Sequence, residues 1–193
     1  MRMQATAATS CLPGALDRPA RLVCLGGERV LIRPIRPNDA KAHAAFVRRL
    51  TPEDLRFRFF TGVHDLSEAE MFRFTSVDHL SETAFIAIRE ATLETVGVAR
   101  LARAPGGSEG EFAIVVAPAM KRKGLGAELI RRLIGWARAH GLTAITGQVM
   151  AENAEMLRLA RRLGFNLRRE PEAPDLVEVR LSVGAEGVPG GPG

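Results

Sequence analysis

The residues best suited to chemistry form a short basic turn rich in glycine. Lys121-Arg122-Lys123-Gly124-Leu125-Gly126 follows an apolar run at residues 112–116 and a break at Pro118, and a helix-like segment begins directly after it. The free N–H groups and the positive dipole end of a helix start both favour an anion. The turn therefore predicts a site for a phosphate-bearing ligand.

Positive charge is concentrated around this turn. Residues 121–140 hold six lysine or arginine residues against one acid, Glu128, and this excess of five equals the formal net charge of the whole chain, +5. A nucleic-acid-binding protein usually spreads its basic residues over a face that follows the phosphate backbone. The local excess favours one phosphate-bearing ligand over general nucleic-acid binding, although the remaining arginines could still line a face.

Plainer explanations of the turn stay open. The basic residues could form a solvated loop, and the glycines could simply permit a tight strand-to-helix turn. Nucleotide-binding motifs fit poorly, because Leu129 stands where the dinucleotide motif requires its third glycine and no Gly-Lys-Ser/Thr loop occurs. The segment Gly106-Gly107-Ser108-Glu109-Gly110 matches G-x-S-x-G, but we expect a strand after its serine, where a nucleophile elbow requires a helix.

Length and composition predict a single domain. The 193 residues are 46% hydrophobic and 25% charged, enough for one well-packed core. We expect a flexible N-terminal extension at residues 1–27, a domain at residues 28–183 and a flexible Gly/Pro-rich tail at residues 184–193.

Neither a metal site nor a membrane segment is indicated. Cys11 and Cys24 lack metal-ligand spacing, so we expect free thiols and no metal. The four histidines are scattered; they are His43, His64, His79 and His140. Without an apolar signal or membrane-length run, a cytoplasmic location is favoured, and organelle targeting by the acid-poor start is the weaker alternative.

The elements that must position the basic turn alternate between strands and helices. Strands are expected at residues 29–33, 84–88, 95–101, 111–117, 144–150, from 165 onward and at 176–183. Helices are expected after the cap residues Asn38 and Asp39, after Thr51-Pro52, after Ser67, and at residues 125–140 and 153–163. An antiparallel meander followed by β-α-β-α-β predicts an α/β (α+β) fold.

Several motifs together resemble the GNAT superfamily of acyl-CoA-dependent N-acyltransferases. They are the run from Glu111 to Val116, the basic glycine turn, and the segment from Asn153 to Leu163-Gly164-Phe165. The upstream motifs are similar to the acetyltransferase domain of Pat-type protein lysine acetyltransferases; they are Arg33-Pro34-Ile35-Arg36-Pro37-Asn38-Asp39, Leu50-Thr51-Pro52-Glu53, Arg58-Phe59-Phe60 and Gly97-Val98-Ala99-Arg100-Leu101. The likeness covers about residues 29–183. It implies the GNAT fold, a mixed and mostly antiparallel sheet of about six to seven strands with helices on both faces.

The resemblance implies acetyl-CoA as cosubstrate. The CoA diphosphate would lie on the loop and helix start, at Lys121, Arg122, Lys123, Gly124, Leu125, Gly126 and Ala127. The pantetheine arm would follow the strand end at Val115 and Val116, where open backbone groups can pair with its amides. Asn153 would cap a helix, approach the pantetheine arm, or share both roles.

The resemblance also implies that Glu111 is the general base. A lysine amine with an unperturbed pKa near 10.4 is neutral in only about one molecule in a thousand at pH 7, so the transfer needs a proton acceptor. We expect Glu111 to be buried beside Phe112 and other apolar neighbours. The alternative is an ordinary surface glutamate at a strand end.

Two positions depart from the family pattern. Lys121 stands where many members have glutamine or arginine, and Ala160 stands where a tyrosine often serves as general acid. The chain contains no tyrosine. The thiolate would then take a proton from water or another group, or leave unprotonated, which a thiol pKa near 8.5 allows.

The favoured acceptor is a protein lysine, reached by direct transfer in a ternary complex. This choice rests on the Pat-type resemblance. A small-molecule amine acceptor, a non-catalytic acyl-CoA-binding regulatory module and a basic nucleic-acid-associated protein are the alternatives, and the sequence leaves monomer or dimer open.

Overall fold

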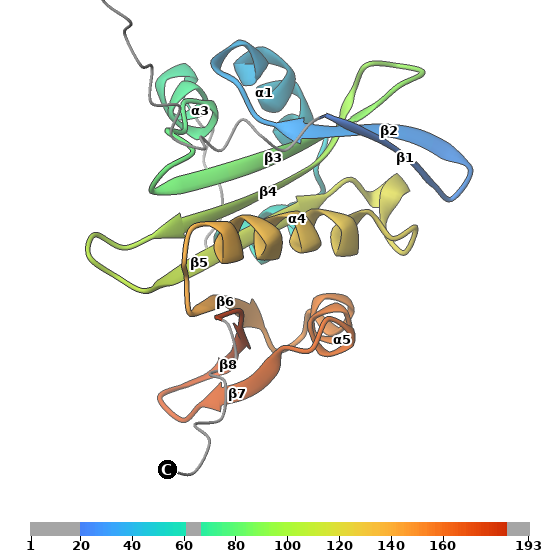
Figure 1. Ribbon diagram of the computed structural model, residues 1–193. Helices are drawn as coiled ribbons and strands as arrows, with labels where there is room; N and C mark the ends of the chain where they lie inside the picture. Colours follow the sequence, from blue (N-terminus) through green and yellow to red (C-terminus); the bar gives the residue numbers. More distant parts are fainter. Residues whose placement is uncertain (1–19, 61–66, 185–193) are drawn as a thin grey trace, which may run out of the picture.

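The computed structural model describes residues 20–60 and 67–184, which form one eight-stranded sheet with helices on both faces (Figure 1). The strands are β1 (Arg21–Leu25), β2 (Glu28–Pro34), β3 (Glu82–Arg89), β4 (Thr95–Arg103), β5 (Glu109–Val116), β6 (Ala144–Met150), β7 (Asn166–Glu170) and β8 (Ala173–Ser182). The helices are α1 (Ala40–Arg48), α2 (Pro52–Phe59), α3 (Glu68–Thr75), α4 (Leu125–Ala139) and α5 (Ala154–Arg162), with short 3-10 turns η2 (Pro37–Asp39) and η3 (Pro118–Met120).

The strand order is β1-β2-β3-β4-β5-β6-β8-β7. Neighbouring strands run antiparallel except β5 and β6, which are parallel. The expected mixed, mostly antiparallel sheet is confirmed, with eight strands rather than about six to seven. The additional strand is β1, which lies inside the segment expected to be a loose extension.

A two-residue turn explains β1. Gly26 and Gly27 both have positive φ, 56° and 81°, and they connect β1 to β2 as a tight hairpin. Glycine adopts this backbone without a steric penalty, and two such residues between antiparallel strands twist the hairpin correctly. The sequence signal for β1 was therefore the Gly-Gly pair rather than the hydrophobic pattern.

Two hydrophobic cores lie on opposite faces of the sheet, as the alternation of β3 illustrates. Phe85 and Ala87 belong to the core under α4 and α5, whereas Ala84 and Ile86 belong to the core under α1 and α3. Successive side chains of a strand point to opposite faces, so a strand buried on both faces reads as one apolar run. Figure 1 shows α4 in front of the sheet and α5 beside the β6–β8 group.

The helix starts follow their cap residues, with one difference. Thr51 and Ser67 accept hydrogen bonds from the amides of Asp54 and Glu70, as capping boxes require. Helix α1 also begins directly after Asp39, but that carboxylate does not cap it. Asp39 instead accepts hydrogen bonds from the guanidinium of Arg33 and the amide of Arg36.

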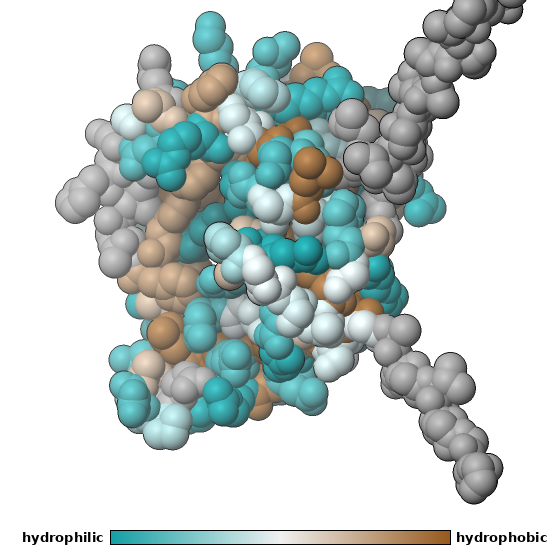
Figure 2. All heavy atoms as spheres, turned by 60° about the vertical axis from the view of Figure 1, so that its left-hand side comes forward, coloured by the Kyte–Doolittle hydropathy of each residue, from teal (hydrophilic) through white to brown (hydrophobic). Residues whose placement is uncertain are grey.

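The described surface has no single dominant hydrophobic area in the view of Figure 2, where hydrophilic side chains prevail and hydrophobic ones form separate patches. The large exposed hydrophobic residues are Leu22, Phe60, Phe72, Leu80 and Leu93. Within residues 20–60 and 67–184, no helix is long and apolar enough to span a membrane. Cys24 is an exposed free thiol. Cys11, His64, most of the expected extension and residues 185–193 of the expected tail lie outside the described residues.

Candidate active site at the fork between β5 and β6

Strands β5 and β6 separate just beyond Glu111. Their parallel pairing includes only Glu109, Gly110 and Glu111, opposite Ala144, Ile145 and Thr146. Each strand keeps its other neighbour, since β5 pairs with β4 up to Val116 and β6 pairs with β8 up to Met150. The two strands therefore form a fork in which the facing backbone edges have no sheet partner.

A cavity of about 320 Å³ lies at this fork. Four elements, α2, β5, β6 and α5, form its walls. The lining residues are Phe57, Arg58, Phe59 and Phe60 from α2 and its C-terminal end, Glu111, Phe112, Ala113 and Ile114 from β5, Gln148 and Val149 from β6, and Asn153 and Met156 at the start of α5. Two of the predicted site residues, Glu111 and Asn153, thus share one cavity although they are far apart in the sequence.

Glu111 differs from the other glutamate of β5, Glu109, in its partners among the described residues. Glu109 points to the same face of the strand and forms a two-bond ion pair with Arg180, which lowers the pKa of Glu109 chiefly through its hydrogen bonds. Glu111 forms no ion pair with any residue in the described ranges. Its side chain is exposed, so the expected burial of Glu111 is wrong for this structure. Glu111 is the last residue of β5 that pairs with β6, at the closed end of the fork.

The basic turn leads into α4 through an uncapped helix start. Gly124 occupies the N-cap position with φ 94°, a conformation that side chains other than glycine rarely adopt, and provides no side-chain acceptor for the first amides of α4. A Cβ atom on Gly126 would lie 3.0 Å from Leu159 and 4.0 Å from Val116. The helix start, the end of β5 and α5 therefore converge where the fork is open.

The lysines of the turn are already paired with acids from distant segments. Lys121 donates to Asp54 of α2, and Lys123 donates to Glu28 of β2. Arg122 is 86% exposed and lies 3.8 Å from Glu155. The excess of positive charge that the sequence places here is thus partly compensated, and Arg122 keeps the most solvent-accessible charge of the three.

The other predicted site residues have mixed surroundings. Val115 packs toward the core under α1 and α3, whereas Val116 packs toward the core under α4. Leu125 is fully buried, so only its backbone can serve a ligand, and Ala127 is half-buried in the first turn of α4. Asn153 caps α5 by accepting from the amide of Met156, which confirms its expected cap position.

Helix α2 spans the fork and is attached on both sides. Asp54 bonds to Lys121 next to α4, and Arg56 forms an ion pair with Glu152 next to α5. The helix thereby places Arg58 and its neighbouring phenylalanines over the cavity. In the sequence, Arg58, Phe59 and Phe60 indicate only a family likeness. The alternation of arginine and phenylalanine from Arg56 to Phe60 is the local signal for an aromatic wall.

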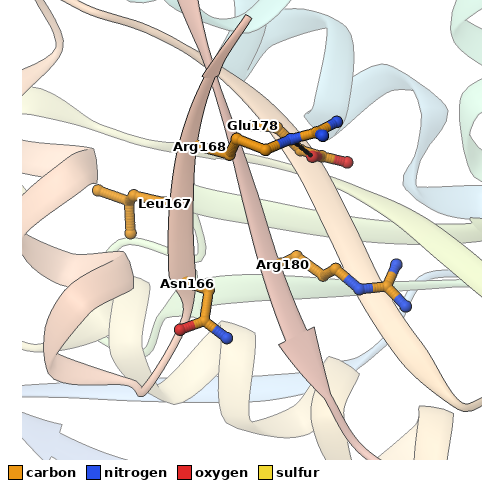
Figure 3. Close-up of a pocket in the computed structure, with 5 residues that line it drawn as sticks. All are labelled: Asn166, Leu167, Arg168, Glu178 and Arg180. Carbon is orange, nitrogen blue, oxygen red and sulfur yellow. Dashed lines mark hydrogen bonds and ion pairs between the residues drawn. The ribbon is translucent and has the colours of Figure 1, made fainter.

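A second hollow, of about 410 Å³, lies at the β7–β8 end of the sheet (Figure 3). Arg168 and Glu178 are joined by an ion pair there, and Arg180 belongs to the pair with Glu109. None of the predicted site residues lines this hollow. Its charged groups already have partners, so the forked cavity is the better candidate for chemistry.

Comparison with known proteins identifies the family to which the chain belongs. A family described as "Acetyltransferase (GNAT) domain" matches residues 29–166. A Pseudomonas aeruginosa protein named Acetyltransferase PA5475 is 32% identical over 159 residues, which cover 81% of this chain and 86% of that protein.

Solved structures share the fold. The GNAT domain of S. lividans PAT has a TM-score of 0.77 and 24% identity, over 84% of this chain and 96% of that one. The structure of yncA from Salmonella typhimurium with its cofactor acetyl-CoA has a TM-score of 0.67 and 20% identity, over 84% of this chain and 99% of that one. With the family match over most of the chain and the curated relative, these findings show that the chain belongs to the GNAT family of acetyltransferases.

Proposed function

We propose that this protein transfers an acetyl group from acetyl-CoA directly to a primary amine, most suitably a protein lysine, with Glu111 as the general base. The observation that carries the proposal is the fork between β5 and β6, which has at its closed end the carboxylate of Glu111, without an ion-pair partner in the described part of the chain. The protein-lysine acceptor comes from the sequence motifs that resemble Pat-type protein lysine acetyltransferases, and the S. lividans PAT domain shares the fold.

Acetyl-CoA fits the open end of the fork. Its diphosphate would meet the uncapped amides of Gly124, Leu125, Gly126 and Ala127, with positive charge from Arg122 and from the paired lysines, Lys121 and Lys123. Its pantetheine amides would pair with the open edge of β5 at Val115 and Val116, as a peptide pairs with an edge strand. Asn153 Oδ1 is engaged as a helix cap, so its side-chain NH₂ would make any contact with the pantetheine arm.

Each chemical step has a defined proton and bond balance. The ammonium group of the acceptor loses one proton to the carboxylate of Glu111, directly or through water, and the neutral nitrogen attacks the thioester carbonyl carbon. The nitrogen of the resulting tetrahedral intermediate then gives its second proton to water. The C–S bond then breaks and CoA leaves as thiolate or takes a proton from water. No side chain at position 160 assists this departure, because Ala160 is fully buried in the core.

A small-molecule amine is the second candidate acceptor. The cavity of about 320 Å³ is the size of an ordinary small-ligand pocket, and it would also admit a lysine side chain. The acceptor-specific measurement is release of free CoA from acetyl-CoA with either deacetylated lysate proteins or a panel of small amines. CoA release with lysate proteins supports the protein acceptor, release only with small amines rejects it, and no release with any acceptor rejects the enzyme activity.

A further inference from the structure

The cavity contains a cation that no acid in the described residues neutralises. The guanidinium of Arg58 lies over the ring of Phe59, 4.8 Å from its centroid, and lines the cavity wall. In the described part of the chain, it has neither an ion-pair partner nor a hydrogen-bond acceptor. A largely buried charge without a partner is costly, which makes Arg58 a candidate for binding an external anion.

The surroundings of Arg58 are positive rather than compensating. Burial lowers the pKa of Arg58 to about 10, Arg100 acts in the same direction, and Glu111 acts against both. At pH 7 the guanidinium is still charged. His43 stands nearby, and burial lowers its pKa to about 4, so at pH 7 it is neutral and adds no further positive charge.

Other arginines around the fork already hold an acid or an acceptor. Arg56 pairs with Glu152 and Arg180 pairs with Glu109. Arg168 pairs with Glu178, as Figure 3 shows. Arg100 pairs with Glu82 and also donates to the carbonyl of Phe74. Acids are therefore present on this side of the molecule, and yet none within residues 20–60 and 67–184 pairs with Arg58.

Arg58 and Glu111 both line the cavity but form no ion pair with each other, so one positive and one negative group remain apart on its walls. The complementary ligand is an ammonium group for Glu111 joined to an anion for Arg58, and a planar guanidinium binds a carboxylate through two parallel hydrogen bonds. An ammonium group without a nearby anion would be attracted by Glu111 but repelled by Arg58. We infer that the preferred acceptor carries a carboxylate close to its amine and that Arg58 binds this carboxylate.

This inference rests on the proposed acetyl transfer and narrows its acceptor class. Two sources supply the chemistry: a protein lysine beside an acidic residue, or a free amino acid. For a protein acceptor, the flanking aspartate or glutamate would reach Arg58 while the lysine amine reaches Glu111. For a free amino acid, its own carboxylate would reach Arg58 while its amine reaches Glu111.

Matched acceptors test the carboxylate directly. One pair is a short peptide containing Glu-Lys and the same peptide with Gln-Lys; the other is free lysine and 1,5-diaminopentane, which lacks the carboxylate. For wild type we expect kcat/KM to be at least tenfold higher for the carboxylate member of one pair, mainly through a lower KM. A difference within the peptide pair identifies a protein lysine beside an acidic residue as the acceptor, and a difference within the other pair identifies a free amino acid.

Variants assign the effect to Arg58. Arg58→Met should reduce the preference to less than twofold, and Arg58→Lys should restore only part of it because the two-bond geometry is lost. Arg73→Met, at an exposed arginine of α3, is the control and should keep the full preference. Circular dichroism and acetyl-CoA binding verify folding; if Arg58→Met does not fold, the Arg58→Lys series and the wild-type pairs still decide.

Binding separates failure of this inference from failure of the proposed function. Calorimetric titration of the CoA-loaded protein with the same acceptors does not require turnover. Equal affinity within each pair, or a preference unchanged in Arg58→Met, overturns the role of Arg58 even if acetyl transfer occurs. Absence of CoA release with every acceptor overturns the proposed function, while tighter binding of the carboxylate member would still support the carboxylate site.

Discussion

The ammonium group of Lys121 donates a hydrogen bond to the carboxylate of Asp54, whose side chain is only 3% exposed. The first residue of the basic turn is thereby joined to α2, the helix that covers the forked cavity. Lys121 consequently has a structural role that its place in a phosphate-binding turn does not reveal. Arg122, by contrast, is 86% exposed and forms only a long ion pair, 3.8 Å from Glu155.

Replacing Lys121 by methionine should lower the free energy of unfolding by about 2 kcal/mol, because the buried carboxylate of Asp54 loses its cation while Thr51 still donates to it. Arg122→Met is the matched control and should change the free energy by less than about 0.5 kcal/mol. Urea denaturation of both variants measures the difference. Equal losses would show that the Lys121–Asp54 bond adds no stability.

Replacing Arg122 by alanine should instead weaken acetyl-CoA binding by about three- to tenfold, the effect of one exposed charge-assisted contact. The salt dependence of the affinity should also decrease, because exposed charges are screened by salt. Calorimetry at two salt concentrations measures both effects. Lys41→Ala, at an exposed lysine on α1, is the control; a similar loss in that variant would point to overall charge rather than to the turn.

The ion pair between Arg33 and Asp39 should make stability depend on pH. Burial by itself raises the pKa of Asp39, but hydrogen bonds from Arg33 and from the amide of Arg36 outweigh it and hold the pKa below its ordinary 3.8. A lowered pKa in the folded state stabilises the protein above pH 3.8, and this contribution is lost as pH falls through the folded-state value.

Asp39→Asn should therefore cost about 2 kcal/mol at pH 7, because Arg33 loses a charged partner that is almost fully buried. Denaturation of both proteins from pH 7 down to pH 3 should show a constant difference above about pH 5 that shrinks below pH 3.8. A difference that stays the same at pH 3 would contradict the pKa assignment.

Installing the family's usual tyrosine at position 160 should not improve catalysis. Ala160 is fully buried in the core under α4 and α5, so a much larger side chain would overpack that core and cost about 1–3 kcal/mol or more. We expect a lower melting temperature and no rise in kcat. A stable Ala160→Tyr variant with faster turnover would show that the site lacks a proton donor and has room for one.

The sequence predicts most strands and helices because their signals are local. Capping boxes at Thr51 and Ser67 and the apolar periodicity of residues 125–140 each act within one element. The position of Glu111 on a strand beside the basic turn was also predictable, because β5 and α4 are adjacent in the chain. The Gly26-Gly27 pair shows that a short edge strand such as β1 can be predicted from the turn that connects it to the next strand.

The charge pairing and the exposure of the site residues could not be predicted, because they depend on contacts between distant segments. The pairing of Lys121 with Asp54 and of Lys123 with Glu28 joins residues 67 and 95 positions apart, and neither pattern nor spacing encodes such a choice. The exposure of Glu111 and the lack of an ion-pair partner for Arg58 among the described residues likewise depend on how α2 lies across the fork. Local sequence thus predicts the elements of the site, whereas packing between them decides which charges remain available.

The most direct test of the account compares Glu111→Gln with Glu109→Gln, two neighbouring glutamates on the same face of β5. Glu111→Gln should lower kcat by about 10²- to 10⁴-fold, the usual contribution of a general base, while its dissociation constant for acetyl-CoA stays within about twofold of wild type. Glu109→Gln, which disturbs only the ion pair with Arg180, should keep kcat within a few-fold. Unchanged turnover in Glu111→Gln, with acetyl-CoA binding intact, would contradict the assignment of Glu111 as the base.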